Sequence, residues 1–222
     1  MNNISKAALA AAGFAMAPAA ATAETPFSAG AIGGSTGFGV EARYAVNEKI
    51  ALRGGLSTLT WDVDETLDDV DYSGDLNYDA AALFVDYHPF ASGFFVSGGF
   101  YFSGPELDLT ATPSGPTEIG GVTYTPAQIG MLDVDADIGD TAPFIGIGWS
   151  NAQRTDSGLY FSALAGAAFY GDASANLEAI GGLLANDPTF LSDIAAEEAN
   201  LEEDLDDFKT YPVIQIGLGY RF

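Results

Sequence analysis

The sequence YPVIQIGLGYRF, residues 211–222, ends the chain and decides its fold. Its apolar side chains alternate, so that one face of an extended strand carries Ile214, Ile216, Leu218, Tyr220 and Phe222. The other face is polar or glycine apart from Val213. A soluble sheet can bury such a face too. A terminal strand of membrane-spanning length with an aromatic end is, however, the pattern with which bacterial outer-membrane barrels close, so it predicts a membrane-spanning barrel.

The first 23 residues have the composition of a secretory signal peptide. Lys6 precedes an alanine-rich apolar stretch that ends in Ala21-Thr22-Ala23, an A-x-A cleavage pattern. The alternative is a membrane anchor, but the stretch is short and is interrupted by Gly13 and Pro18. We therefore expect two parts, a signal peptide over 1–23 and a barrel over 24–222.

Composition excludes several classes of function. The chain has no cysteine, which rules out disulfides and thiolate chemistry. It has 31 acidic and 7 basic residues and a net charge of −24, so a basic footprint for nucleic acid is missing. The acids gather in three segments, 62–75, 133–140 and 197–207. We expect no nucleic-acid partner.

Seven strands follow from period-two patterns, and an even count requires a weaker first strand near 26–33. The seven are expected near 36–46, 50–61, 76–87, 93–103, 143–150, 159–170 and 211–222. The connections alternate between short and long, which places the long segments 62–75, 104–142 and 171–210 on one side of the membrane. The predicted fold class is all-β: a transmembrane eight-stranded antiparallel up-and-down β-barrel with a short helix in the last outer loop.

That helix is predicted to begin at Asp187, a capping residue, with Pro188 in its first turn. Its apolar face is expected to carry Leu191, Ile194, Leu201, Leu205 and Phe208. The aromatic belt at the outer interface is expected to consist of Trp61, Tyr78, Phe102, Tyr170 and Tyr211.

Three charged residues are predicted to face the lumen: Glu41, Arg43 and Arg53. Arg43 and Arg53 lie opposite each other if residues 47–49 form the turn, and two like charges need acids nearby. Glu41 and Asp79 are predicted to supply them. The set is interpreted either as an ion network that fills the barrel or as the lining of a small polar pore, since eight strands leave room for little more than side chains.

The acidic segment after residue 61 is a weak candidate for a metal site. Its possible ligands are Asp62, Asp64, Asp68, Asp69 and Asp71. An EF-hand needs glycine at its sixth position and glutamate at its twelfth, where this chain has Leu67 and Ser73. Loose binding of Ca²⁺ or Mg²⁺ stays open beside a solvated acidic loop. Residues 132–138 alternate strictly and predict a strand above the membrane with its aspartates on one face.

No catalytic set is predicted. His88 is the single histidine, so Ser–His–Asp chemistry would have to use it, and it falls in a predicted periplasmic turn. We therefore expect no enzymatic activity and no cofactor.

Four segments carry a resemblance to a known family: Tyr87-His88-Pro89-Phe90, residues 119–125, residues 142–149 and the terminal strand. The chain resembles a poorly characterised family of proteobacterial outer-membrane proteins of eight-stranded β-barrel type. The similarity covers most of the mature chain, and residues 119–125 and 142–149 are its more specific parts. The resemblance implies a barrel in the outer membrane of a Gram-negative bacterium and no established activity.

The sequence thus predicts an integral outer-membrane barrel with a structural or surface-interaction role through acidic extracellular loops. The alternative is a porin-like, narrow cation-favouring channel for small solutes. The expected partners are outer-membrane lipid, lipopolysaccharide and, through the C-terminal strand, the barrel-assembly machinery. A monomer is expected.

Overall fold

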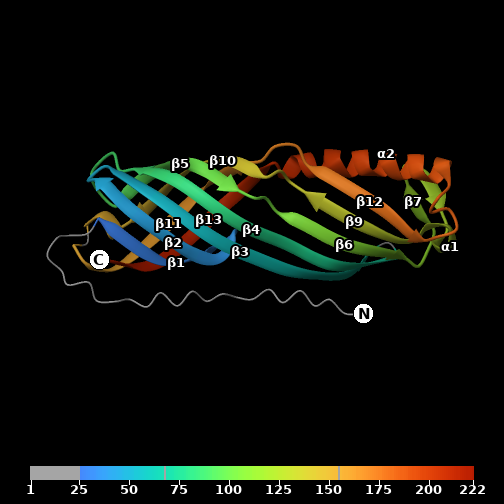
Figure 1. Ribbon diagram of the computed structural model, residues 1–222, viewed down its shortest axis with the longest axis horizontal. Coiled ribbons are helices and arrows are strands. Elements are labelled where there is room, and N and C mark those ends of the chain that lie inside the picture. The colour runs from blue at the N-terminus through green and yellow to red at the C-terminus, as the bar shows by residue number, and fades with distance from the viewer. Residues whose placement is uncertain (1–25, 68, 155) are drawn as a thin grey trace.

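The computed structural model describes residues 26–67, 69–154 and 156–222. The molecule is elongated, with a barrel at one end and a sheet covered by a helix at the other (Figure 1). The predicted signal peptide lies outside the described residues. No helix in the described part of the chain is long and apolar enough to cross a membrane.

Eight strands of the described residues close the barrel in sequence order, and β1 pairs with the terminal strand β13 through partners such as Ser28 and Arg221. The ring consists of β1 (Phe27–Gly34), β2 (Gly37–Asn47), β3 (Ile50–Leu67), β4 (Val70–Tyr87), β5 (Phe94–Phe102), β10 (Thr141–Ser150), β11 (Gly158–Phe169) and β13 (Thr210–Arg221). Every neighbouring pair is antiparallel. This confirms the predicted fold class, including the weak first strand.

The outward face of the barrel is apolar because it meets lipid. Phe38, Val40 and Leu56 are largely exposed, whereas Glu41, Arg43 and Arg53 between them are buried inside the ring. Side chains alternate between the two faces of a strand, so lipid outside and a packed lumen inside impose this pattern. The orientation predicted for β2 and β3 is therefore correct.

Two strands continue far beyond the membrane. β3 and β4 are 18 residues long each and pair without interruption from Ile50 and Tyr87 to Leu67 and Val70. A spanning strand needs only about 9–11 residues. The segment 62–75 is therefore a hairpin, and its prediction as a solvated loop is wrong. Side chains alternate along this part of β4, and its apolar face carries Val70 and Tyr72, which pack against the helix that contains Phe190.

Three more strands extend the sheet sideways from the part of β4 that lies beyond the barrel. β6 (Glu106–Pro113) pairs with β4, β9 (Gly130–Asp137) pairs with β6, and β12 (Ser174–Gly181) pairs with β9. We call these three strands, together with residues 59–67 of β3 and 70–78 of β4, the outer sheet. β9 is the strand expected above the membrane at 132–138.

Helix α2 (Pro188–Leu205) covers the inner face of the outer sheet. As predicted, Asp187 caps it, because its Oδ1 accepts from the backbone N–H groups of Thr189 at 2.9 Å and Phe190 at 3.2 Å. The buried residues are Phe190 and Ile194, whereas Leu191 and Phe208 are 47% and 62% exposed. The predicted apolar face was thus partly wrong: Ile194 is buried as expected, but Phe190 takes the place expected of Leu191.

Three small elements complete the hydrophobic core beneath α2: β7 (Thr117–Ile119), β8 (Val122–Tyr124) and α1 (Pro126–Ile129). Two 3₁₀ turns lie outside this core, η1 (Ala152–Arg154) between β10 and β11 and η2 (Asp206–Phe208) directly after α2. Tyr124 packs edge-on against Phe190 and donates its hydroxyl hydrogen to Asp193. Gly120 donates its N–H to Glu197 Oε2 at 2.9 Å. These contacts fix the helix over the sheet.

Candidate functional site

Four charged side chains form a closed cluster inside the barrel. Arg53 donates from Nε and Nη2 to the two carboxylate oxygens of Asp86, at 2.9 and 3.2 Å, and from Nη2 to Ser97 Oγ at 3.1 Å. Glu41 lies 3.7 Å from Arg53 and 3.9 Å from Arg43, and Arg43 lies 3.6 Å from Asp86. We call Glu41, Arg43, Arg53 and Asp86 the lumen cluster. Two cations and two anions balance within it.

The structure brings together Glu41, Arg43 and Arg53 but places the predicted fourth member elsewhere. Asp79 is exposed on the outward face of β4, and the fully buried Asp86 supplies the second acid. β4 pairs with β3 without a register shift, so residues an odd number apart face opposite sides. The outward apolar residues Leu83, Val85 and Tyr87 could have indicated this phase in the sequence.

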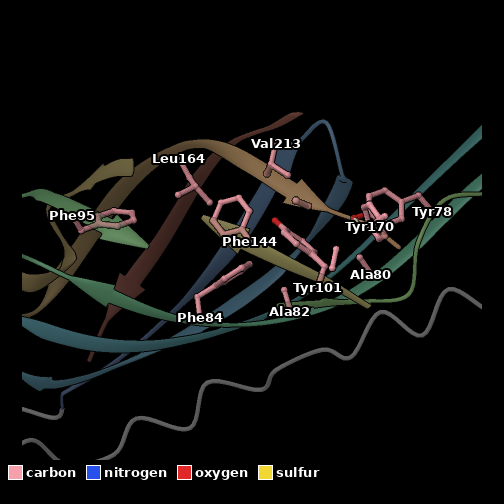
Figure 2. Packing of buried hydrophobic residues seen from close by; sticks show 12 residues of the cluster. Tyr78, Ala80, Ala82, Phe84, Phe95, Tyr101, Phe144, Leu164, Tyr170 and Val213 are labelled. Carbon is pink, nitrogen blue, oxygen red and sulfur yellow. Dashed lines mark hydrogen bonds between the residues drawn. The ribbon is translucent and has the colours of Figure 1, made fainter. Parts of the chain in front are cut away.

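Aromatic side chains fill the lumen above the cluster. Phe84, Tyr101 and Phe144 lie together in Figure 2. Their rings meet edge to face with centroids 5.1–5.6 Å apart. Phe95 lies lower, under the Arg43 guanidinium at 5.3 Å, and Phe84 lies 4.3 Å from that of Arg53. We call Phe84, Phe95, Tyr101 and Phe144 the aromatic plug. A lumen cavity beside it, lined by Glu41, Arg53 and Tyr101, measures about 10 Å³, space for one water molecule.

The outer mouth of the barrel is closed by tyrosines. The Tyr78 and Tyr170 hydroxyls are 2.5 Å apart, and Tyr211 packs edge-on against both rings. These three residues were predicted to form an outer aromatic belt facing lipid. That prediction is wrong, because all three side chains point inward and share one core with the aromatic plug.

His88 closes the opposite end. It is fully buried, its ring lies 5.3 Å from that of Phe95, and its Nδ1 donates to the Ser92 carbonyl at 2.9 Å. This bond holds the turn after β4 against the base of the lumen. His88 thus has a packing role in the turn.

The outer sheet carries aligned carboxylates on the face opposite to α2. Cross-strand partners place Asp62, Asp75, Asp108 and Asp135 in one row across β3, β4, β6 and β9. We call these four residues the acidic row; all are exposed. A hydrogen bond shared with Asp62 and the negative charge of Asp62 and Asp108 raise the pKa of Asp75. Repulsion between neighbouring strands is therefore built into this face.

The predicted metal ligands do not form one site. Asp64 accepts from Ser73 Oγ at 3.0 Å, Asp71 accepts from Thr66 Oγ1 at 2.6 Å, and Asp69 adopts a positive φ in the hairpin turn. Asp62 lies opposite Asp75, and Asp68 lies outside the described residues. Over the described ranges, no group of three or more acidic or histidine side chains is arranged to hold a metal ion.

Comparison with known proteins supports the fold. The structure is similar to crystal structures of CarO2 and CarO from Acinetobacter baumannii. The TM-scores are 0.57 and 0.56 at 21% sequence identity in both cases; 89% of this chain is covered, and 99% and 98% of the two neighbours. No family model matches, and no curated protein matches by sequence. The narrower family resemblance therefore stays a prediction.

Proposed function

We propose that this protein acts in the outer membrane of a Gram-negative bacterium as a surface-interaction protein, with the barrel as its anchor and the outer sheet as its working part. The acidic row carries the proposal. Its four carboxylates stand side by side in water, and the ion pairs formed by the described residues include none of them. Such a surface attracts cations and basic groups.

Three observations support this location. The terminal strand has the pattern with which outer-membrane barrels close, the lipid-facing wall is apolar, and the structural neighbours come from such a bacterium. We further propose that the barrel-assembly machinery recognises the C-terminal strand. Lipopolysaccharide is a suitable neighbour for the acidic row when divalent cations bridge its phosphates to the carboxylates.

The proposal is tested with short oligolysine peptides and Mg²⁺, titrated into the refolded protein in detergent. We expect the double variant Asp75→Asn/Asp108→Asn to bind oligolysine several-fold more weakly, with a shallower salt dependence. The control Glu118→Gln/Asp140→Asn removes two exposed carboxylates outside the acidic row. Equal losses in the two variants would refute a specific role of the row.

A narrow cation-favouring channel is the second candidate. It is favoured by the small residues Gly55 and Ser57, which line a lumen cavity beside the aromatic plug. The plug opposes it, so we expect wild-type protein to pass no current in planar bilayers. Phe144→Ala should open small, cation-selective steps once folding is verified by gel mobility. Current of equal size from the wild type would make the channel the better proposal, and large anion-selective steps would contradict both.

A further inference from the structure

The outer sheet has two edges, on β12 and on β3, and they differ in whether their backbone groups have partners. Backbone N–H groups of the β12 edge are bonded to α2. Ala175 donates its backbone N–H to Glu202 Oε1 at 3.3 Å, and Leu177 donates to Glu198 Oε1 at 2.8 Å. Both glutamates come from α2, which lies along β12. The helix therefore satisfies donors that would otherwise offer themselves to another strand.

The opposite edge, on β3, is open. The pairing of β2 with β3 ends at Phe38 and Thr58, whereas the pairing of β3 with β4 continues to Leu67. Among the described residues, no strand covers β3 from Leu59 to Leu67 on the side away from β4. In an antiparallel ladder, alternate residues direct their N–H and C=O groups to either side, so every second residue here offers both to solvent.

The protection of this edge against strand pairing is acidic only, from Asp62, Asp64 and Glu65. Residues 59–67 contain no lysine and no proline, and their register with β4 has no bulge. On the inner side the edge carries Trp61, which is 67% exposed. On the outer side it carries Asp62 and Asp64, and Asp62 belongs to the acidic row. An extended partner would meet backbone groups, an aromatic ring and carboxylates together.

We propose that residues 59–67 of β3 form a docking site for an extended, basic peptide segment of a partner protein, which adds to the outer sheet as a further strand. Main-chain hydrogen bonds supply the affinity of such β-augmentation, and alternate side chains supply its specificity. Lysine or arginine side chains would lie over Asp62 and Asp64, and apolar ones beside Trp61. The inference rests on the proposed function of the acidic outer sheet.

Charge selects this occupant over a second copy of the chain. Pairing two β3 edges would bring Asp62, Asp64 and Glu65 of one copy against the same acids of the other. Like charges directly opposite each other destabilise a strand pair. A basic segment instead neutralises carboxylates that the described residues leave without a cationic partner.

The first experiment separates strand pairing from simple charge attraction. The probe is a blocked peptide of alternating lysine and valine, about nine residues long. Two isomers carry backbone N-methyl groups, one at the lysines and one at the valines, so that each loses the N–H groups of one edge without any change of charge. We expect one isomer to bind the refolded protein at least about tenfold more weakly than the parent peptide, and the other to bind like the parent.

The second experiment locates the peptide, and the cysteine-free chain allows single cysteines to be introduced. Thr66→Cys lies on the open edge strand and Ser174→Cys on the closed one. They are matched, because each native hydroxyl is exposed and donates to one aspartate at 2.6 Å. A parent peptide with a bromoacetyl terminus should alkylate Thr66→Cys at least about tenfold faster than Ser174→Cys.

The outcomes are distinguishable. Equal binding of both methylated isomers would overturn the docking site and leave the proposed acidic surface intact. Absence of binding by the parent peptide and by oligolysine would instead contradict the proposed function. Equal alkylation of the two cysteines would overturn the placement on β3. Rapid disulfide dimers of Thr66→Cys without peptide would show that a second copy occupies this edge.

Discussion

The carboxylates of the lumen cluster and those of the acidic row have opposite surroundings. Inside the barrel, Glu41 and Asp86 are buried and matched by Arg43 and Arg53 within 4 Å. Outside, the carboxylates of the acidic row face water and one another. Buried charge must be compensated within the chain, whereas hydrated charge needs no partner. The lumen cluster thus serves the fold, and the acidic row is free to serve an interaction.

The largest effect is expected from breaking the lumen cluster. Asp86→Ala leaves Arg43 and Arg53 buried with one acid between them, which should lower the free energy of unfolding by about 3–5 kcal/mol. Asp79→Ala, on the same strand but exposed, is the control and should change it by less than about 0.5 kcal/mol. Urea unfolding in lipid vesicles, followed by gel mobility, measures both. Similar losses would mean that the two aspartates are not separated by the barrel wall.

A smaller effect is expected where a carboxylate serves the outer region as a cap. Asp187→Ala removes the acceptor for the Thr189 and Phe190 amides and should destabilise α2 by about 1 kcal/mol. Hydrogen exchange of these two amides should accelerate while exchange in the barrel strands stays unchanged. The control is Glu203→Ala, an exposed change in the same helix. A matching acceleration in the barrel would show that the two regions unfold together.

The smallest effect concerns pH and the acidic row. Because the folded pKa of Asp75 lies above its ordinary value of 3.8, stability from this group is fully present below that value and is lost as the pH rises through the folded pKa. The outer sheet should therefore exchange its amides more readily at pH 7 than at pH 4, after correction for intrinsic rates. Asp75→Asn should reduce the difference, as should added salt. Unchanged pH dependence in this variant would assign the effect to other acids.

The barrel itself was predictable because lipid leaves few alternatives. Every spanning strand must show an apolar outer face over membrane length, and the alternation in Phe38, Val40 and Leu56 reports this directly. Arg43 and Arg53 were placed correctly by the same rule, since their hairpin has a short turn that fixes the register.

The outer sheet was not predictable because strands in water do not need the apolar outer face that lipid requires. Above the membrane a strand needs one apolar face only, so Asp62 and Asp64 suggested a loop although Val63 lies between them. Asp79 was predicted where Asp86 lies, because the phase of β4 was not fixed from Leu83, Val85 and Tyr87, which alone show it. Tyr78, Tyr170 and Tyr211 were assigned to an interface because aromatic residues suit both a lipid boundary and a packed core.

The order of the strands along the chain determines when each part of the outer sheet is synthesised. In the sequence, β6 and β9 lie between the barrel strands β5 and β10, and β12 and α2 lie between β11 and β13. The chain therefore leaves the barrel wall twice to build the outer sheet and returns to the wall each time. β6 pairs with β9 within the first excursion of the chain, and the pairing of β9 with β12 joins segments from the two separate excursions. The last pieces to arrive, β12 and α2, directly precede the strand that seals the ring. The chain has therefore supplied every part of the outer sheet before it supplies the strand that closes the ring.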